Sequence, residues 1–131
     1  MAKYLLDTCV CISMFRNEGN VRDTLRNVGV ENCYISEITV AELYFGLAKS
    51  TDKKRKQEDI REVQRLFRVI PAYSSFKEYG EIRQSLEHTG QRVDQFDLLI
   101  GATALHHHLT LVTSNLKHFE RIEGLKIENW K

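Results

Sequence analysis

Short apolar runs, each only a few residues long, recur along this chain and are separated by longer segments with helical periodicity. The runs Tyr4–Leu6, Cys33–Ser36 and 109–113 are too short for buried helices and are typical of strands. Residues 125–127 read as a closing strand, and Arg68–Ile70 as a short or edge strand. Strands that alternate with helices are joined by right-handed crossovers and form a parallel sheet covered on both faces. We therefore expect an α/β fold.

The segments between these runs carry apolar side chains at the spacing of helices. Val21, Leu25 and Val28, for example, recur at i, i+4 and i+7 and form one stripe. Gly90 is expected to end the helix that begins near Phe76. Helices are expected over about residues 10–15, 21–28, 39–48, 52–67, 76–89, 94–107 and 116–121.

The bulk composition narrows the class of protein. The 131 residues suit one domain, 1–131, since no linker, repeat or low-complexity tract interrupts them. A net charge of +1 excludes a bulk polycation, so any contact with nucleic acid must come from local patches. Three cysteines without a CxxC pair indicate free thiols in a reducing compartment. No segment has the length of a membrane span or of a signal peptide, which places the protein in the cytoplasm.

Polar side chains fall where elements meet. Asp7 directly follows the first strand, and Glu42 lies in the first turn of the helix after the second strand. Asp97 opens the helix before the strand at 109–113, and Asn115 follows that strand. The carboxyl ends of parallel strands share one edge of a sheet, where active sites lie. Clustered carboxylates repel one another unless a hard cation such as Mg²⁺ offsets the cost.

Each acid also has a purely structural interpretation, and spacing alone does not separate the two. Thr39 with Glu42 fits the capping box, in which the glutamate returns a hydrogen bond to the helix start. Asp94 is suited to be the N-cap before Asp97, and Asp7 to cap the helix that follows it.

Four motifs in order carry a resemblance to a known family. They are residues 5–8 (LLDT), 36–46 (SEITVAELYFG), 97–105 (DLLIGATAL) and 111–119 (LVTSNLKHF). Together with the ending at 121–130, this set resembles the PIN-domain ribonucleases, and within them the VapC toxins. The resemblance implies a three-layer α/β/α sandwich around a short parallel sheet. It also implies a Mg²⁺- or Mn²⁺-dependent endoribonuclease that leaves a 5′-phosphate and a 3′-hydroxyl.

The same resemblance assigns roles to residues. Asp7, Glu42 and Asp97 match the acidic triad and are the expected metal ligands. Many members carry a fourth acid at the position that Asn115 occupies, and asparagine is also common there. Thr39 and Thr113 match hydroxyls near the site; the list of catalytic candidates is Asp7, Glu42, Asp97 and Asn115.

Similar toxins act on RNA, form homodimers and are silenced by a cognate antitoxin. We therefore expect an RNA substrate, an antitoxin partner encoded elsewhere, and a homodimer with contacts from Val21–Val28 or from residues 44–47. The alternative is a catalytically silent PIN-like module that binds RNA or protein, because Asn115 replaces the fourth acid.

Other features argue against rival functions or leave RNA contact open. A haloacid-dehalogenase-type phosphatase needs a second acid where Cys9 stands, and neither a GxGxxG nor a P-loop pattern occurs. The consecutive histidines at 106–108 point in different directions on a helix and make a poor chelate. His118 is expected to pack beside Phe119 or line the groove rather than act as a base. Candidate RNA contacts are Lys53, Lys54, Arg55, Lys56, Arg61, Arg65 and Arg68, or else Arg16, Arg22 and Arg26.

Overall fold

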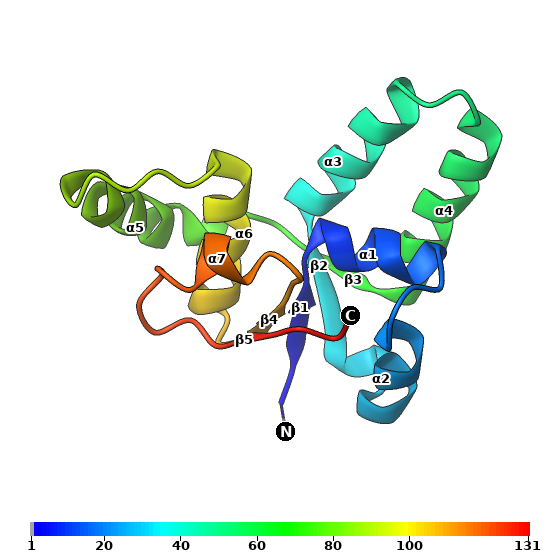
Figure 1. The fold of residues 1–131 in the computed structure, drawn as a ribbon, viewed down its shortest axis with the longest axis horizontal. Helices are drawn as coiled ribbons and strands as arrows, with labels where there is room; N and C mark the ends of the chain where they lie inside the picture. The colour runs from blue at the N-terminus through cyan, green and yellow to red at the C-terminus, as the bar shows by residue number, and fades with distance from the viewer. Residues whose placement is uncertain (1) are drawn as a thin grey trace.

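The computed structural model describes residues 2–131; Met1, the first residue of the predicted domain, lies outside the described residues. Its strands are β1 (Tyr4–Leu6), β2 (Cys33–Ser36), β3 (Arg68–Ile70), β4 (Thr110–Val112) and β5 (Ile127–Glu128). They form one sheet in the order β3-β2-β1-β4-β5, and every neighbouring pair is parallel (Figure 1). The predicted parallel sheet is confirmed, with β1 at its centre.

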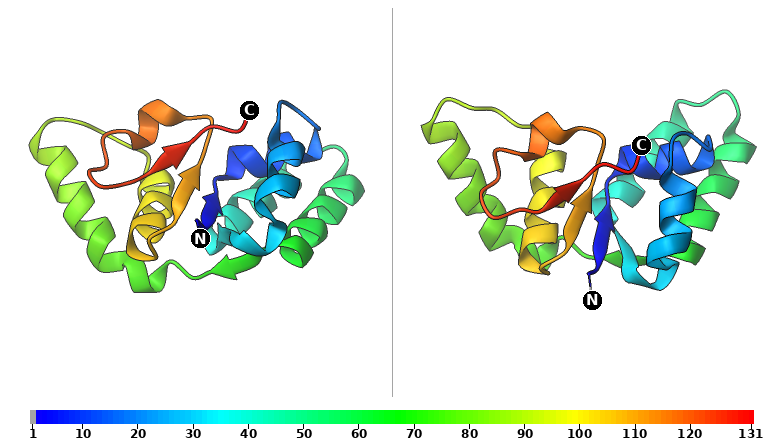
Figure 2. Two further views of the ribbon diagram at one scale, coloured as in Figure 1. Left: turned by 90° about the horizontal axis from the view of Figure 1, so that it is seen from below. Right: turned by 60° about the horizontal axis from the view of Figure 1, so that its bottom comes forward.

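Helices cover both faces of this sheet (Figure 2). They are α1 (Thr8–Phe15), α2 (Val21–Val28), α3 (Glu37–Ala48), α4 (Lys53–Leu66), α5 (Phe76–His88), α6 (Gln95–His106) and α7 (Leu116–Phe119). Single turns of 3₁₀ helix, η1 (Val30–Asn32) and η2 (Tyr73–Ser75), precede β2 and α5.

The alternation of side chains along the strands divides the core in two. Leu6 of β1 packs with apolar residues of α1, α2 and α4, whereas Leu5 packs with those of α5, α6 and α7. Both leucines are fully buried. The three predicted layers are therefore present, and a strand of three residues contributes to both halves of the core.

Two helices begin earlier than the sequence suggested. The predicted start of α3 at Thr39 is wrong: α3 begins at Glu37, and the Ser36 hydroxyl caps it by accepting the Ile38 N–H at 3.0 Å. Thr39 is instead buried inside the helix. Likewise, α1 begins directly after Asp7. Serine and threonine are both good N-cap residues, so the sequence alone does not show which of them begins the helix. The position at which the buried strand β2 ends decides it.

Helix α2 contributes its apolar stripe to the core. Val21 and Leu25 are buried among residues of the α1 face. These two side chains are therefore not available for the subunit contact that the sequence suggested for Val21–Val28, because they already fill the interior.

Helices α3 and α4 form an antiparallel arm beside the sheet (Figure 1). The ammonium of Lys53 closes their connection by donating to the Ala48 carbonyl at 2.7 Å. Of the helices within residues 2–131, none is both long and apolar enough to cross a membrane.

Candidate functional site

The candidate site lies at the edge of the sheet where β1, β2 and β4 end. Because these strands are parallel, the segments that leave them start from the same side of the molecule. Helices α1, α3 and α6 all begin there (Figure 1). The positive ends of three helix dipoles therefore face this edge, which favours negative side chains and phosphate groups nearby.

Asp7 is the most buried acid of the site, with 3% of its surface exposed. One carboxylate oxygen, Oδ1, accepts the Thr8 backbone N–H at 2.8 Å, so Asp7 does cap α1. The other oxygen, Oδ2, accepts the Thr113 hydroxyl at 2.8 Å and faces the Cys9 thiol at 3.5 Å. The structural and the functional interpretations of Asp7 are thus compatible, because different oxygens serve them.

Glu42 lies in the second turn of α3, half-buried at the same edge. Its Oε1 accepts the Thr8 hydroxyl at 2.6 Å, and that hydroxyl lies 3.1 Å from the Thr39 hydroxyl. The capping-box interpretation of Thr39 and Glu42 is wrong, since Ser36 caps the helix and Glu42 bonds to α1 instead. Glu42 is therefore directed towards the start of α1.

Asp97 is placed in the first turn of α6. Asp94 is the N-cap of this helix, as predicted, and its Oδ1 accepts the backbone N–H groups of Phe96 and Asp97 at 2.9 and 3.3 Å. The Asp97 side chain is left free to meet His118, whose Nδ1 lies 2.9 Å from Oδ2. This contact was missed in the sequence, although both residues belong to the motifs that carry the resemblance.

The acids are close enough to disfavour one another's charge. Burial is the largest cause that raises the pKa of Glu42, and the charges of Asp7 and Asp97 add to it. Burial likewise raises the pKa of Asp97, again with a contribution from Asp7. Both effects work against the hydrogen bonds from Thr8 and His118, which favour the charged forms. The structure therefore brings the three acids into one electrostatic neighbourhood.

Asn115 stands at the exposed rim of this neighbourhood. Its backbone N–H donates to the Thr113 hydroxyl at 3.0 Å, and the same hydroxyl donates to Asp7. Thr113 and Thr39 are both fully buried, in contrast to Asn115. The two threonines thus lie beside the acids where the sequence placed them.

The donor set suits a hard divalent cation. Three carboxylates supply the oxygen ligands that Mg²⁺ prefers. A cation would offset the cost of burial, and next the repulsion, that together raise the pKa values of Glu42 and Asp97. Over residues 2–131, however, no three acidic, histidine or cysteine side chains are already arranged as a set of metal ligands. The carboxylates are instead turned to Thr113, Thr8 and His118. Their role as ligands stays a prediction.

Other candidates from the sequence have different surroundings. His106 Nδ1 lies 2.6 Å from the Glu78 carboxylate and so links α6 to α5. Arg22 donates to the Met14 carbonyl, and Arg26 pairs with Asp23. Cys11 and Cys33 are buried free thiols, as expected, and Cys9 is half-buried beside Asp7.

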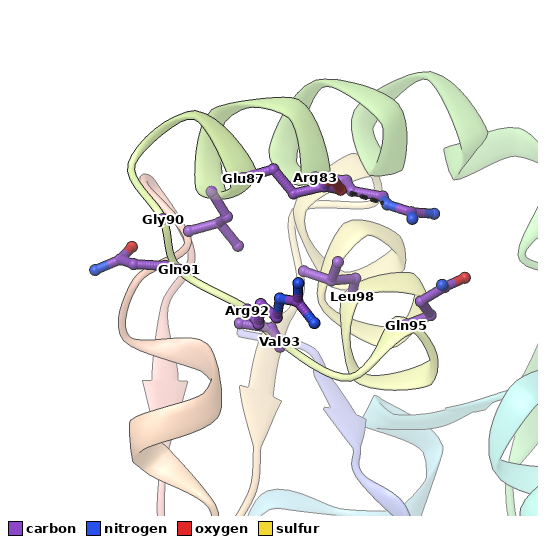
Figure 3. A pocket seen from close by; sticks show the side chains of 9 residues that line it. Arg83, Glu87, Gly90, Gln91, Arg92, Val93, Gln95 and Leu98 are labelled. Atoms are coloured by element: carbon purple, nitrogen blue, oxygen red, sulfur yellow. Dashed lines mark hydrogen bonds and ion pairs between the residues drawn. The ribbon is translucent and has the colours of Figure 1, made fainter.

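Two cavities flank the region. A groove of about 850 Å³ opens beside Glu42 and runs along α1 and α3 towards α4. A second cavity of about 540 Å³ lies where α5, the 90–93 loop and α6 meet (Figure 3). The Arg83–Glu87 ion pair, at 2.7 Å, occupies one wall of this second cavity, and its lining includes none of the four candidate residues. Of these two cavities, only the groove is lined by a candidate site residue, and that residue is Glu42.

Comparisons with known proteins give relatives over nearly the whole chain. The family model of the PIN domain matches residues 4–125. Ribonuclease VapC2 of Rickettsia felis is 35% identical over 131 residues, covering 97% of each chain. The tRNA(fMet)-specific endonuclease VapC of Shigella flexneri is 33% identical over 132 residues, covering 99% of each. The chain also resembles a structure described as DNA-bound VapBC from Salmonella typhimurium, with a TM-score of 0.91, 32% identity and 100% of both chains covered.

Proposed function

This chain belongs to the PIN domain family, and from that premise we propose that it is a Mg²⁺-dependent endoribonuclease, the toxin of a toxin–antitoxin pair. The observation that carries the proposal is that Asp7, Glu42 and Asp97 lie at the carboxyl edge of the sheet, near enough for their charges to contribute, after burial, to the raised pKa values of Glu42 and Asp97. Relatives named ribonuclease or endonuclease match the chain over nearly their whole length, which supports the same activity.

The three acids are the residues that would hold the cation. A divalent cation there would neutralise charge on the phosphate oxygens and make an attacking water more acidic. Charge count governs the affinity of such oxygen sites, so each carboxylate matters. Asn115, at the rim, offers a neutral carbonyl oxygen and an amide that can contact the RNA or an ordered water.

Neighbouring side chains fix the direction of each acid. Thr113 holds Asp7, and Thr8 holds Glu42, through hydroxyl donors on different elements. The N-termini of α1, α3 and α6 lie at this edge, and their partial positive charge favours binding of the phosphodiester group. Water would form the new bond to phosphorus while the bond from phosphorus to the ribose 3′-oxygen breaks, and the 3′-oxygen would leave and take up a proton. The products would then carry a 5′-phosphate and a 3′-hydroxyl, and the ribose 2′-hydroxyl would not react.

The relatives' structures suggest the partner. Solved neighbours are described as VapBC complexes bound to DNA, and one is the VapBC2 complex with a fragment of its promoter. We propose that this chain likewise pairs with a cognate antitoxin and works on RNA in the cytoplasm. A small reading frame beside the gene, whose product co-purifies with this chain, is the expected observation.

A silent RNA- or protein-binding module is the second candidate, favoured only by Asn115 at the position of the fourth acid. A cleavage assay separates the two. Purified protein is incubated with bulk tRNA and with a labelled RNA, in Mg²⁺, in Mn²⁺ and in EDTA. The nuclease yields fragments with 5′-phosphate ends that disappear in EDTA and with Asp97→Asn. Cleavage that survives EDTA, or ends with a 2′,3′-cyclic phosphate, contradicts the proposal; RNA binding without cleavage supports the module.

A further inference from the structure

The cavity of about 540 Å³ between α5, the 90–93 loop and α6 is separate from the acids (Figure 3). Gln95 and Leu98 line it from one side of the first turn of α6. Asp97 belongs to the same turn, but at 100° per residue it projects from the opposite half of the helix. The cavity therefore lies across one helix, a width of about 10 Å, from the proposed cleavage site.

The guanidinium of Arg83 is held in one wall of this cavity. Its Nε donates to the Glu87 carboxylate at 2.7 Å, and its Nη1 donates to the Tyr79 hydroxyl at 2.9 Å. That hydroxyl in turn donates to the Gln95 side chain at 3.3 Å, which links α5 to the start of α6. A guanidinium carries five N–H donors, so these bonds orient Arg83 and still leave donors for a ligand.

Arg92 supplies a second guanidinium, which is unpaired. It belongs to the loop that Gly90, with a φ of +75°, turns away from the end of α5. Its exposed side chain extends into the space between α5 and the start of α6 (Figure 3). Across residues 2–131 it forms no ion pair. Because Glu87, the one acid in the lining, is already paired with Arg83, the cavity carries a net positive charge.

The inner surface of the cavity is apolar, and its outer edge carries amides. Leu86 and Leu98 line it and are buried, with the half-buried Val93 beside them. Gln91 and Gln95 also line it and are more exposed. Apolar surface can cover the face of a base, and a glutamine amide can both donate to and accept from the edge of a base.

We propose that this cavity binds a phosphorylated nucleoside, with the phosphate between Arg83 and Arg92 and the base against Leu86 and Leu98. Arginine suits this role because the donors of its planar fork can hold two phosphate oxygens at once. A phosphorylated serine or threonine of a protein would use the same arginines but brings no ring to cover the buried leucines. Binding needs no metal, so it is independent of the proposed cleavage.

Two sources supply a ligand of this chemistry. One is a nucleotide of an RNA strand that lies across the acids and continues over α6, since Gln95 precedes Asp97 by only two residues. The other is a free mononucleotide from solution. Both present the same phosphate, ribose and base to the cavity, and the experiment separates them.

NMR titration of the ¹⁵N-labelled full-length protein in EDTA tests the cavity, with adenosine 5′-monophosphate (AMP) as the probe. AMP should shift the backbone amide signals of residues 90–95 and of Leu98. Adenosine lacks the phosphate, ribose 5-phosphate lacks the base, and O-phosphotyrosine replaces the base with a phenyl ring. Each of these three is expected to bind at least about tenfold more weakly than AMP, because each loses one set of contacts.

Substitutions then assign the phosphate contact. Arg92→Gln removes no ion pair within the protein, so it should keep the melting temperature and weaken AMP binding by about tenfold to a hundredfold. Arg83→Lys keeps the charge but not the fork of donors, and it should also weaken AMP binding. Arg121→Gln is the matched control, because Arg121 is exposed and does not line this cavity. It should bind AMP as the wild type does.

Binding of a labelled single-stranded RNA in EDTA, followed by anisotropy, decides the source of the ligand. If the nucleotide belongs to RNA, Arg92→Gln weakens RNA binding and lowers the slope of log affinity against log salt by about 0.7, as for one phosphate contact. Excess AMP then weakens RNA binding as well. If the ligand is a free nucleotide, neither Arg92→Gln nor AMP changes the affinity for RNA.

Three results would overturn the nucleotide site. They are AMP that leaves the amides of residues 90–95 unshifted, Arg92→Gln that binds AMP as tightly as Arg121→Gln does, and ribose 5-phosphate or O-phosphotyrosine that binds as tightly as AMP. Because every titration is made without metal, a protein that binds AMP in this way but never cleaves RNA contradicts only the ribonuclease function. A protein that cleaves RNA but does not bind AMP contradicts only the nucleotide site.

Discussion

At the scale of single residues, each acid of the site is held by a different uncharged or weakly basic donor. Thr113 donates to Asp7, Thr8 donates to Glu42, and His118 contacts Asp97. None of these donors is a lysine or arginine, so none neutralises the site permanently. The acids are thereby oriented, yet their negative charge stays available for a cation.

His118 is predicted to act as a positioning residue for Asp97. Removing it in His118→Ala should weaken Mn²⁺ binding, measured by the free-ion EPR signal, by about tenfold to a hundredfold, as is usual when a hydrogen bond to a metal ligand is lost. His118→Asn places an amide near the position of Nδ1 and should recover part of the affinity. Identical Mn²⁺ affinity in the wild type and in His118→Ala would contradict this role.

The three acids of the site could be identified from the sequence, but the side chains that form hydrogen bonds with them could not. Asp7, Glu42 and Asp97 were found because each follows or precedes an apolar run, and because the motifs resemble a family. Spacing alone did not decide between capping and function, and in the structure Asp7 does cap α1. The contact between His118 and Asp97 joins residues that are far apart in the chain, so no local pattern reports it.

At the scale of elements, it was easier to predict whether a segment is a helix or a strand than to predict the residues at which it begins and ends. The α2 stripe and the α4 helix were expected almost where they occur, because their apolar residues recur with a clear period. The start of α3 was misplaced since Ser36 and Thr39 are both good caps. The predicted closing strand at 125–127 was displaced, and β5 is Ile127–Glu128. Its two residues are defined only by pairing with β4, which is a long-range contact.

The C-terminal end of α6 should give the protein a small pH dependence, because His107 is exposed and solvent screens its charge. His107 is exposed, but some loss of solvent around its ring, and next the charge of His106, lower its pKa below the ordinary 6.5. The unfolded chain therefore takes up this proton at a higher pH than the folded chain does. The contribution to stability is complete above pH 6.5 and is lost as the pH falls towards the lowered folded value.

Urea unfolding at about pH 7.5 and about pH 5 measures this effect. The wild type should lose more unfolding free energy between the two values than His107→Gln does. Matched losses in the two proteins would show that His107 does not contribute. Glu78, whose pKa is lowered chiefly by its hydrogen bond with His106, gives the same direction of change only at still lower pH, so it does not mask the difference.

At the scale of the whole molecule, strand order was not predictable from the chain. Alternating strands and helices predict a parallel sheet, but many orders satisfy that pattern. The observed order places β1 between β2 and β4, and this choice is what carries Asp7, Glu42 and Asp97 to one edge. Leu5 and Leu6 of the three-residue strand β1 pack on opposite faces of the sheet, so this strand links the two halves of the core.

A homodimer remains the prediction for the assembled molecule. With Val21 and Leu25 buried, the candidate contacts are those of residues 44–47, among which Tyr44 is exposed and does not line the groove. Light scattering at micromolar concentration should give twice the chain mass, and Tyr44→Asp should shift it towards the monomer, because a charge is costly in an apolar interface. A monomeric wild type would contradict the prediction, and a dimeric Tyr44→Asp would move the contact elsewhere.

Thermal unfolding with and without Mg²⁺ tests most directly whether the three acids form a cation site. The wild type should gain about 2.7 kcal/mol when Mg²⁺ is near 100 times its dissociation constant. Asp7→Asn keeps a side chain that can cap α1 but removes a charge. It should be as stable as the wild type without metal, or more stable, and should lose most of the Mg²⁺ gain. If Mg²⁺ stabilises neither protein, or stabilises both equally, the acids are not the cation site.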